Sequence, residues 1–184
     1  MTFTVQVVTV TESGEEVGRN VACVERQELT PASLGLAITD SKAILQGLQE
    51  VVVEWQMRTY LDTQRHCPHC GKLRQSKGGH HTGFRTVFGD LPVDSPRFTH
   101  CPCQEQATAS FSPLATLLPE RTTPELLYLE TKWASLASYG ITVKLLQDVL
   151  PCDEPLEAVT IRNHVCTLAE RLEEELGEER GSYI

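Results

Sequence analysis

Two pairs of cysteines constrain the fold of this 184-residue chain more than any other feature of its sequence. Cys67 and Cys70 are two residues apart and precede Gly71, whereas Cys101 and Cys103 are one residue apart. Each spacing lets two thiolates turn toward one cation, and the glycine relieves the tight turn behind the first pair. The thirty residues between the pairs are typical of a β-hairpin. The pattern predicts a zinc ribbon, in which Zn2+ is structural because four cysteines leave no open coordination position.

Other ligand sets and another chemistry fit parts of this stretch. His100 and Cys103 also have the spacing of a common ligand pair, and His66 and His69 adjoin the first cysteines. We expect Cys101 and Cys103 as the second pair, because an all-thiolate site suits structural zinc. A redox Cys-x-x-Cys usually opens a helix after a strand, whereas this one follows a predicted helix. The default interpretation of the other three cysteines is a buried free thiol: Cys23, Cys152 and Cys166.

Charge is distributed unevenly along this acidic chain, whose net charge is -9. That total argues against a nucleic-acid partner, but local charge decides where a polyanion docks. Residues 65–97 contain six basic and two acidic side chains, whereas the segments on either side are both negative. We therefore expect contacts to a DNA phosphate backbone from basic residues of the cysteine segment: Lys72, Arg74, Lys77 and Arg85.

The N-terminus and the apolar runs bear on the compartment. The first residues lack the basic start, long apolar centre and small-residue cleavage site of a secretory signal. No apolar run approaches the roughly 20 residues that a membrane span requires. These features predict a cytoplasmic protein with reduced thiols and no membrane partner.

The N-terminal third is typical of a hairpin followed by a long helix. Strands are predicted over residues 3–10 and 21–29, with turn residues between them. A helix is predicted over residues 41–65, with Asp40 as its N-cap. Spacing marks one apolar face, formed by Leu45, Leu48, Val52 and Trp55. Val51 and Val53 widen that face, as if the helix were covered on two sides.

The segment between the cysteine pairs predicts its own hairpin. Residues 81–88 are strand-like, Gly89 and Asp90 are a turn signal, and residues 91–100 return. Pro92 and Pro96 confine the return strand to a sheet edge or to irregular structure.

The C-terminal part is helical in pattern. Thr123 as N-cap and Pro124 at the first helical position start one helix, and Gly140 fits its end. A short helix ends at Pro151 and a turn follows. A last helix is predicted over residues 159–180. The expected fold class is α+β, with a hairpin and long helix (1–64), a zinc ribbon (65–106) and a three-helix, helix-turn-helix-like domain (107–184).

The last helix carries residues that suit base recognition. In a helix-turn-helix the N-terminal residues of the last helix enter the major groove. Here they include Arg162 and Asn163, which can make bidentate contacts with guanine and adenine edges. His164 follows them. Three acidic residues just before the helix count against this role: Asp153, Glu154 and Glu157.

Several stretches together resemble one family over most of the chain. They are "CPHCGK", "FRTVFGDLPVDSPRFTHCPC", "FSPLATLLPERTTPELLYLETKWASLASYG" and "VTIRNH". They resemble the N-terminal region of ISKra-type insertion-sequence transposases. The resemblance implies a DNA-binding front end that recognises transposon ends, with Arg162 and Asn163 on its DNA-facing helix. It also implies that the family's zinc ligands are Cys67, Cys70, Cys101 and Cys103.

The chain departs from this family in its catalytic part. Family members continue into an RNase H-like domain whose three carboxylates hold two metal ions, which requires a folded sheet. No such pattern follows the helices, and no pair of aspartates suggests a triad. We therefore expect no catalytic residues, and DNA cleavage only together with a catalytic transposase chain. The chain would then be a truncated transposase, the first frame of a split gene or an excised domain.

A rival hypothesis needs no DNA. Zinc ribbons often serve as rigid contact surfaces, and the net charge of -9 suits a protein partner. The chain would then be a protein-interaction or dimerisation module, with its long helix pairing with a second copy.

Overall fold

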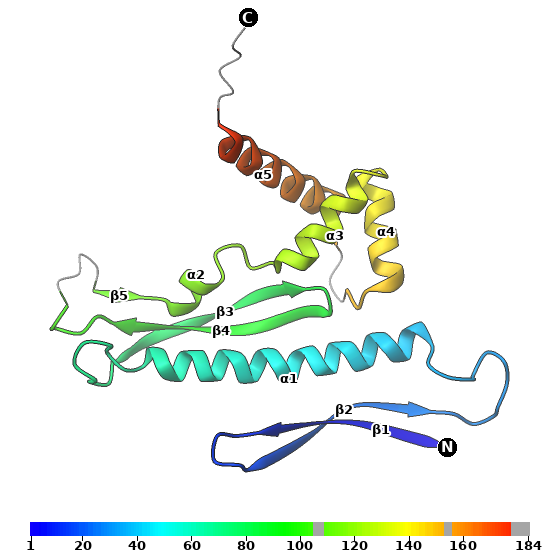
Figure 1. The fold of residues 1–184 in the computed structure, drawn as a ribbon, viewed down its shortest axis with the longest axis horizontal. Coiled ribbons are helices and arrows are strands. Elements are labelled where there is room, and N and C mark those ends of the chain that lie inside the picture. The colour runs from blue at the N-terminus through cyan, green and yellow to red at the C-terminus, as the bar shows by residue number, and fades with distance from the viewer. Residues whose placement is uncertain (105–108, 153–155, 178–184) are drawn as a thin grey trace, which may run out of the picture.

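The computed structural model of this α+β protein describes residues 1–104, 109–152 and 156–177. A long helix, α1 (Ile38–Gln64), runs between two antiparallel hairpins (Figure 1). The first hairpin contains β1 (Thr2–Val10) and β2 (Glu16–Glu25). The second contains β3 (Ser76–Thr86) and β4 (Gly89–Thr99). The predicted fold class is confirmed.

Shorter elements complete the second hairpin and follow it in the chain. A short strand, β5 (Ser110–Phe111), extends it to a three-stranded sheet of order β3-β4-β5. A one-turn helix, α2 (Pro113–Leu117), packs against β4. The last three helices pack together at the end of the β3–β4 hairpin that holds its turn (Figure 1): α3 (Pro124–Ala134), α4 (Tyr139–Val149) and α5 (Ala158–Leu176).

Helix α1 is covered on two sides, as the paired valines indicated. Val51 and Val53 are 3% and 6% exposed, and residues two apart on a helix point about 200° apart. Gly47 lets β2 approach, because a Cβ there would lie 2.5 Å from the backbone oxygen of Val21. The predicted apolar face is not the buried one, since Leu45, Leu48 and Val52 stay exposed and Trp55 is half-buried.

The start of α1 also differs from the prediction. Ala37 is the N-cap and Asp40 is the third helical residue. The Asp40 carboxylate accepts a hydrogen bond from the backbone N–H of Ala37 at 2.8 Å and pairs with Arg26. From the third helical position, the Asp40 carboxylate can still accept the free N–H of the N-cap residue. The helix therefore begins at Ile38, before Asp40.

The first hairpin has a shorter turn than predicted. Gly14 takes a φ of 80° and donates its N–H to the carbonyl of Thr11, which closes the turn within residues 11–15. Residues 16–20 can therefore pair with β1.

The three cysteines outside the thiol pairs were expected to be buried. Cys23 lies exposed on β2, Cys166 is exposed on α5 and Cys152 is half-buried. The expectation of burial was wrong for Cys23 and Cys166.

The second hairpin turns two residues earlier than predicted. Thr86 pairs with Gly89, so Val87 and Phe88 form the turn. The Thr86 hydroxyl donates to the Gly89 carbonyl at 2.8 Å, and Gly89 supplies a φ of 124°. Arg85 and Asp90 are therefore strand partners rather than turn neighbours.

Strand β4 forms the core of this sheet. Its inward side chains alternate along the strand, with Leu91, Val93, Ser95 and Phe98 all at most 5% exposed. Pro92 and Pro96 lie between them, in the part of β4 that pairs with β3 alone among the described strands, because β5 pairs only with Phe98 and Thr99. The prediction of an edge strand or irregular structure was wrong for the strand as a whole, because β4 is the central strand of the sheet; the prolines are tolerated because β5 is too short to reach them.

The three C-terminal helices meet at a small apolar core. Leu126, Leu146 and Ile161, one from each helix, are at most 3% exposed.

Thr123 caps α3, since its hydroxyl accepts the N–H of Leu126 at 3.4 Å. Gly140 does not end that helix. It lies inside α4, because the carbonyl of Ser138 accepts two amides and starts the next helix there.

Parts of two sequence predictions lie outside the described residues. They concern Asp153, Glu154 and the end of the last predicted helix.

Within the described ranges, no helix combines the length and the apolar character that a transmembrane segment needs.

Candidate metal centre

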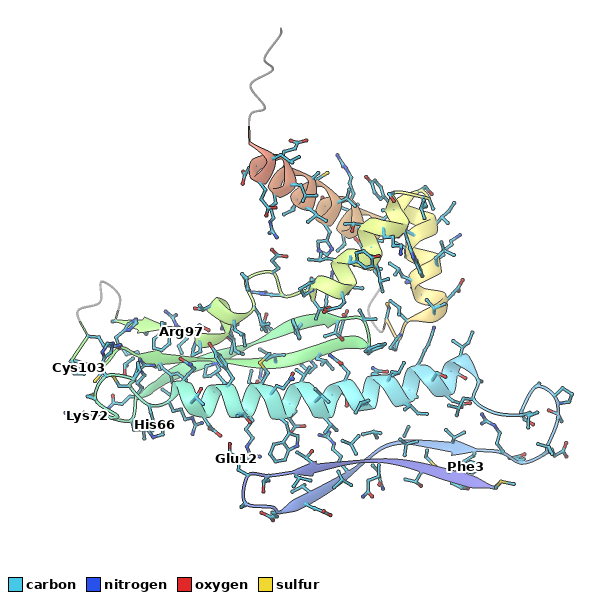
Figure 2. All side chains as sticks on the ribbon, in the orientation of Figure 1. Phe3, Glu12, His66, Lys72, Arg97 and Cys103 are labelled. Atoms are coloured by element: carbon cyan, nitrogen blue, oxygen red, sulfur yellow. The ribbon has the colours of Figure 1, made fainter. Side chains whose placement is uncertain are left out.

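The four predicted cysteine ligands come together at one end of the β3–β4 hairpin. Cys67 and Cys70 follow the end of α1, whereas Cys101 and Cys103 follow the end of β4. All four Sγ atoms lie within 4.8 Å of one another. Figure 2 shows Cys103 at this end of the molecule, together with His66 and Lys72. The sequence pairing therefore corresponds to one group in space.

Tight backbone turns present the thiols of both pairs. The Gly71 N–H donates to the Cys67 carbonyl at 2.8 Å, and the Cys67 N–H donates to the Lys72 carbonyl at 2.9 Å. Gly71 takes a φ of 71°, which explains a glycine at this position. In the second turn, the Gln104 N–H donates to the Cys101 carbonyl at 2.9 Å.

Distances between the sulfur atoms fit a tetrahedral metal ion. The shortest are 3.4 Å, from Cys70 to Cys101, and 3.5 Å, from Cys103 to both Cys67 and Cys70. Four sulfurs at about 2.3 Å from zinc lie roughly 3.8 Å apart. A disulfide would need about 2.05 Å. The group can therefore hold one metal ion, and its sulfurs are too far apart to be disulfide-bonded.

Electrostatics within the group favour a bound cation. Burial opposes ionisation of Cys67, but backbone N–H groups of Cys70 and His69 that face its sulfur lower its pKa to about 6. The backbone N–H of Cys103 likewise lowers the pKa of Cys101. In contrast, the adjacent thiols of Cys101, Cys70 and Cys67 raise the pKa of Cys103 to about 12. Four thiolates this close repel one another, and a divalent ion would relieve that repulsion.

A small cluster of side chains supports the thiol group. Arg74 donates to the Gln64 carbonyl at 3.0 Å and stacks over the ring of Phe111 at 4.8 Å. Phe98 meets Phe111 edge to face. The His100 ring lies 4.8 Å from that of Phe111. Among the described residues, the metal-binding group contains only the four cysteines, so His100 is not part of it.

The predicted DNA-contacting residues occupy different surroundings. Lys72 and Lys77 are exposed near the metal end, whereas Arg74 is half-buried with its guanidinium engaged inside the protein. Arg85 lies 4.0 Å from Asp90 and pairs through its backbone with the segment before α3.

Arg162 and Asn163 are exposed on the second turn of α5, away from the metal end (Figure 1). The lysines and the α5 residues are thus not brought together. Their roles in DNA contact stay predictions.

Glu130 and Arg121 gave no clear sequence signal, whereas His164 was expected among the base-reading residues of the last helix. Glu130 of α3 is fully buried and contacts His164 of α5, and Arg121, which has a positive φ, lines the same cavity as His164. A glutamate on an otherwise apolar helix face was the one available clue. Its partner is 34 residues away, which spacing cannot indicate.

Comparisons with models of protein families, with curated proteins and with solved structures found no match for this chain. The resemblance to ISKra-type transposases therefore rests on the motifs alone. The fold and the four-cysteine group stand independently of it.

Proposed function

We propose that this chain is a zinc-binding module that binds double-stranded DNA for an insertion-sequence transposase, recognises transposon ends and acts with a catalytic transposase chain. The observation that carries the proposal is the four-thiol group at the end of the basic hairpin, with Lys72 and Lys77 exposed beside it. The transposon-end target comes from the family resemblance.

Zinc has a structural role in this proposal. Four thiolate ligands complete a tetrahedral site, so no position remains for water or substrate. The ion would join the end of α1 to the end of β4. It would thereby fix the hairpin that carries Lys77 and Arg85. Since these ligands lie in two separate turns, metal binding and folding of this end should be coupled.

DNA contacts would divide into two kinds. Lys72 and Lys77 suit phosphates, which position a protein on the duplex without reading its sequence. Arg162 and Asn163, at the N-terminal end of α5, suit base edges in the major groove. Because these sets lie apart, one duplex would have to extend along the molecule to meet both.

Fluorescence anisotropy with a labelled transposon-end duplex tests the proposal. The zinc-loaded chain should bind it more tightly than a scrambled duplex, and affinity should fall as salt rises. Lys77→Ala should weaken binding to both duplexes, whereas Asn163→Ala should reduce the preference for the end sequence. Lys144→Ala, which removes an exposed positive charge on α4, is the matched control. Equal affinity for both duplexes at moderate salt would overturn specific recognition.

A second candidate function is pairing with another copy through α1. Leu45, Leu48 and Val52 are 36–39% exposed on one face of α1. The positions that continue this stripe carry no charge: Ser41, Trp55 and Thr59. Spacing of three and four residues is that of a helix-pairing seam. Sedimentation showing a dimer that Leu48→Glu dissociates, with no duplex binding, would favour this function over the first.

A further inference from the structure

A cleft separates the β3–β4 hairpin from the C-terminal helices. Its volume is about 690 Å³. The hairpin contributes Arg85 and Asp90, the segment before α3 contributes Glu120 and Arg121, and α5 contributes His164. Three segments far apart in the sequence therefore line one cavity, and none of the four cysteines does so.

Backbone pairing fixes Arg121 at the edge of this cleft. The Arg85 N–H donates to the Arg121 carbonyl at 2.8 Å, and the Thr123 N–H donates to the Arg85 carbonyl at 2.9 Å. Arg121 takes a φ of 53°, the left-handed region that side chains other than glycine seldom adopt. Its side chain is exposed, and within the described part of the chain no polar partner engages it.

A buried carboxylate fixes the orientation of His164. Glu130 is 0% exposed, and its Oε2 lies 2.5 Å from Nδ1 of His164. A buried carboxylate is costly unless it is hydrogen-bonded, and an ionised one can only accept. Beside an ionised Glu130, Nδ1 carries the proton in this contact, and Nε2 is the ring nitrogen left for a ligand. The His164 side chain is 23% exposed and lines the cleft.

Charge in the cleft favours an anion. Its two carboxylates each have a cationic partner, since Asp90 lies 4.0 Å from Arg85 and Glu120 pairs with Arg171. Arg121 then remains as an uncompensated guanidinium in the cleft that the His164 imidazole also lines. A guanidinium can hold two oxygens of a phosphate, and a doubly protonated imidazole can donate to a third.

We propose that this cleft binds a phosphate group, with Arg121 and His164 as its ligands and Glu130 as the residue that positions His164. The source is either the backbone of a polynucleotide or a free nucleotide. The polynucleotide source rests on the proposed DNA binding, and it would add a phosphate contact between the basic hairpin and α5.

Nitrogen NMR of the imidazole rings tests the site directly. The zinc-loaded chain would be labelled at histidine, with His164 assigned through His164→Gln, and titrated separately with a 20-base-pair duplex and with ATP. The Nε2 resonance of His164 should shift with at least one of them. Arg121→Ala should weaken that binding roughly tenfold, the loss of one charged hydrogen bond. Lys144→Ala should leave it unchanged.

Salt dependence separates a phosphate contact from a structural effect. If the duplex is the ligand, Arg121→Ala should lower the slope of log affinity against log salt by about 0.9, which a general loss of folded protein would not do. Glu130→Gln keeps the size of the side chain and one acceptor. It should change the His164 ring resonances and weaken binding severalfold while the chain stays folded.

The outcomes distinguish this proposal from DNA binding. A His164 shift with ATP and no duplex binding would support the cleft and overturn DNA as its source. Duplex binding without a His164 shift, at an affinity that Arg121→Ala leaves intact, would overturn the cleft and leave the proposed function standing. No His164 shift with either probe would overturn the proposal as a whole.

Discussion

The two hairpins of this protein are similar in length but differ in what surrounds them. Strand β4 has four side chains that are at most 5% exposed, whereas β1 and β2 together have one, Val24. The β3–β4 hairpin lies beside α1 and α2, and the thiol group closes one end of it (Figure 1). The β1–β2 hairpin packs chiefly on α1 among the described elements. A two-stranded hairpin is marginally stable by itself, so these surroundings decide how firmly each one is held.

This difference predicts two levels of local stability. Segments with few buried apolar contacts open first, and their amides exchange fastest. We therefore expect β1–β2 to open well below the global unfolding free energy. The β3–β4 hairpin should open only when the metal group or the core of β4 is lost.

Metal removal should have the largest effect. Structural zinc sites typically contribute on the order of 10 kcal/mol to folding. Chelation, or Cys101→Ser, should abolish amide protection in β3–β5 while β1–β2 exchanges at nearly its original rate. Hydrogen exchange by mass spectrometry measures both, and metal analysis of the reduced chain should give about one zinc per chain. A chain without zinc that keeps protected β3 and β4 amides would contradict a structural metal.

Core truncation should come next in size. Phe98→Ala removes a side chain that is 2% exposed and contacts Phe111, and should lower the free energy of unfolding by about 3–5 kcal/mol. The matched change in the first hairpin, Val24→Ala, should lower the stability of that hairpin by about 2 kcal/mol. Urea denaturation with residue-level exchange separates the two. Equal loss of protection in both hairpins from either variant would show that they unfold as one unit.

Two glycine substitutions probe how β1–β2 is attached to α1. A Cβ on Gly47 would lie 2.5 Å from the Val21 oxygen, whereas one on Gly140 of α4 meets nothing within 4 Å. Alanine raises helix propensity by about 1 kcal/mol at either position. Gly140→Ala should therefore raise the melting temperature. Gly47→Ala should lower the protection of β2, because its backbone contact leaves no room. A stabilising Gly47→Ala would show that this hairpin is not held by close packing.

The sequence predicted those parts of the fold whose signals are local. Cysteine spacing identified the group at Cys67 and Cys101, and Thr123 with Pro124 identified the start of α3, because ligand turns and helix caps depend on a few neighbouring residues. Val51 and Val53 correctly indicated a helix covered on two sides. The buried faces of α1 were assigned wrongly, since the position of Gly47 against Val21 is a tertiary contact.

Long-range contacts explain the remaining differences. Glu130 and His164 meet only because α3 packs against α5, and Arg121 enters the cleft only because its backbone pairs with Arg85. The hairpin turn at Val87 was missed for a different reason. Gly89 was a real signal for positive φ, but it occupies the first strand position after the turn rather than the turn itself.

The smallest expected effect is a pH dependence confined to the N-terminal region. The hydrogen bond from Arg26, followed by that from the Ala37 N–H, holds the pKa of Asp40 below its usual value. A carboxyl with a depressed pKa in the folded state stabilises that state above its unfolded pKa, near 3.9, and this contribution is lost as pH falls through the folded pKa. Below about pH 4, protection at the start of α1 and at Arg26 should therefore decrease. Asp40→Asn should remove that pH dependence while leaving β3–β4 unchanged, and Asp62→Asn, an exposed change at the other end of α1, is the control. Hydrogen exchange at several pH values, corrected for intrinsic rates, measures this. An equal pH response in both hairpins would place the titrating group elsewhere and remove Asp40 from the comparison.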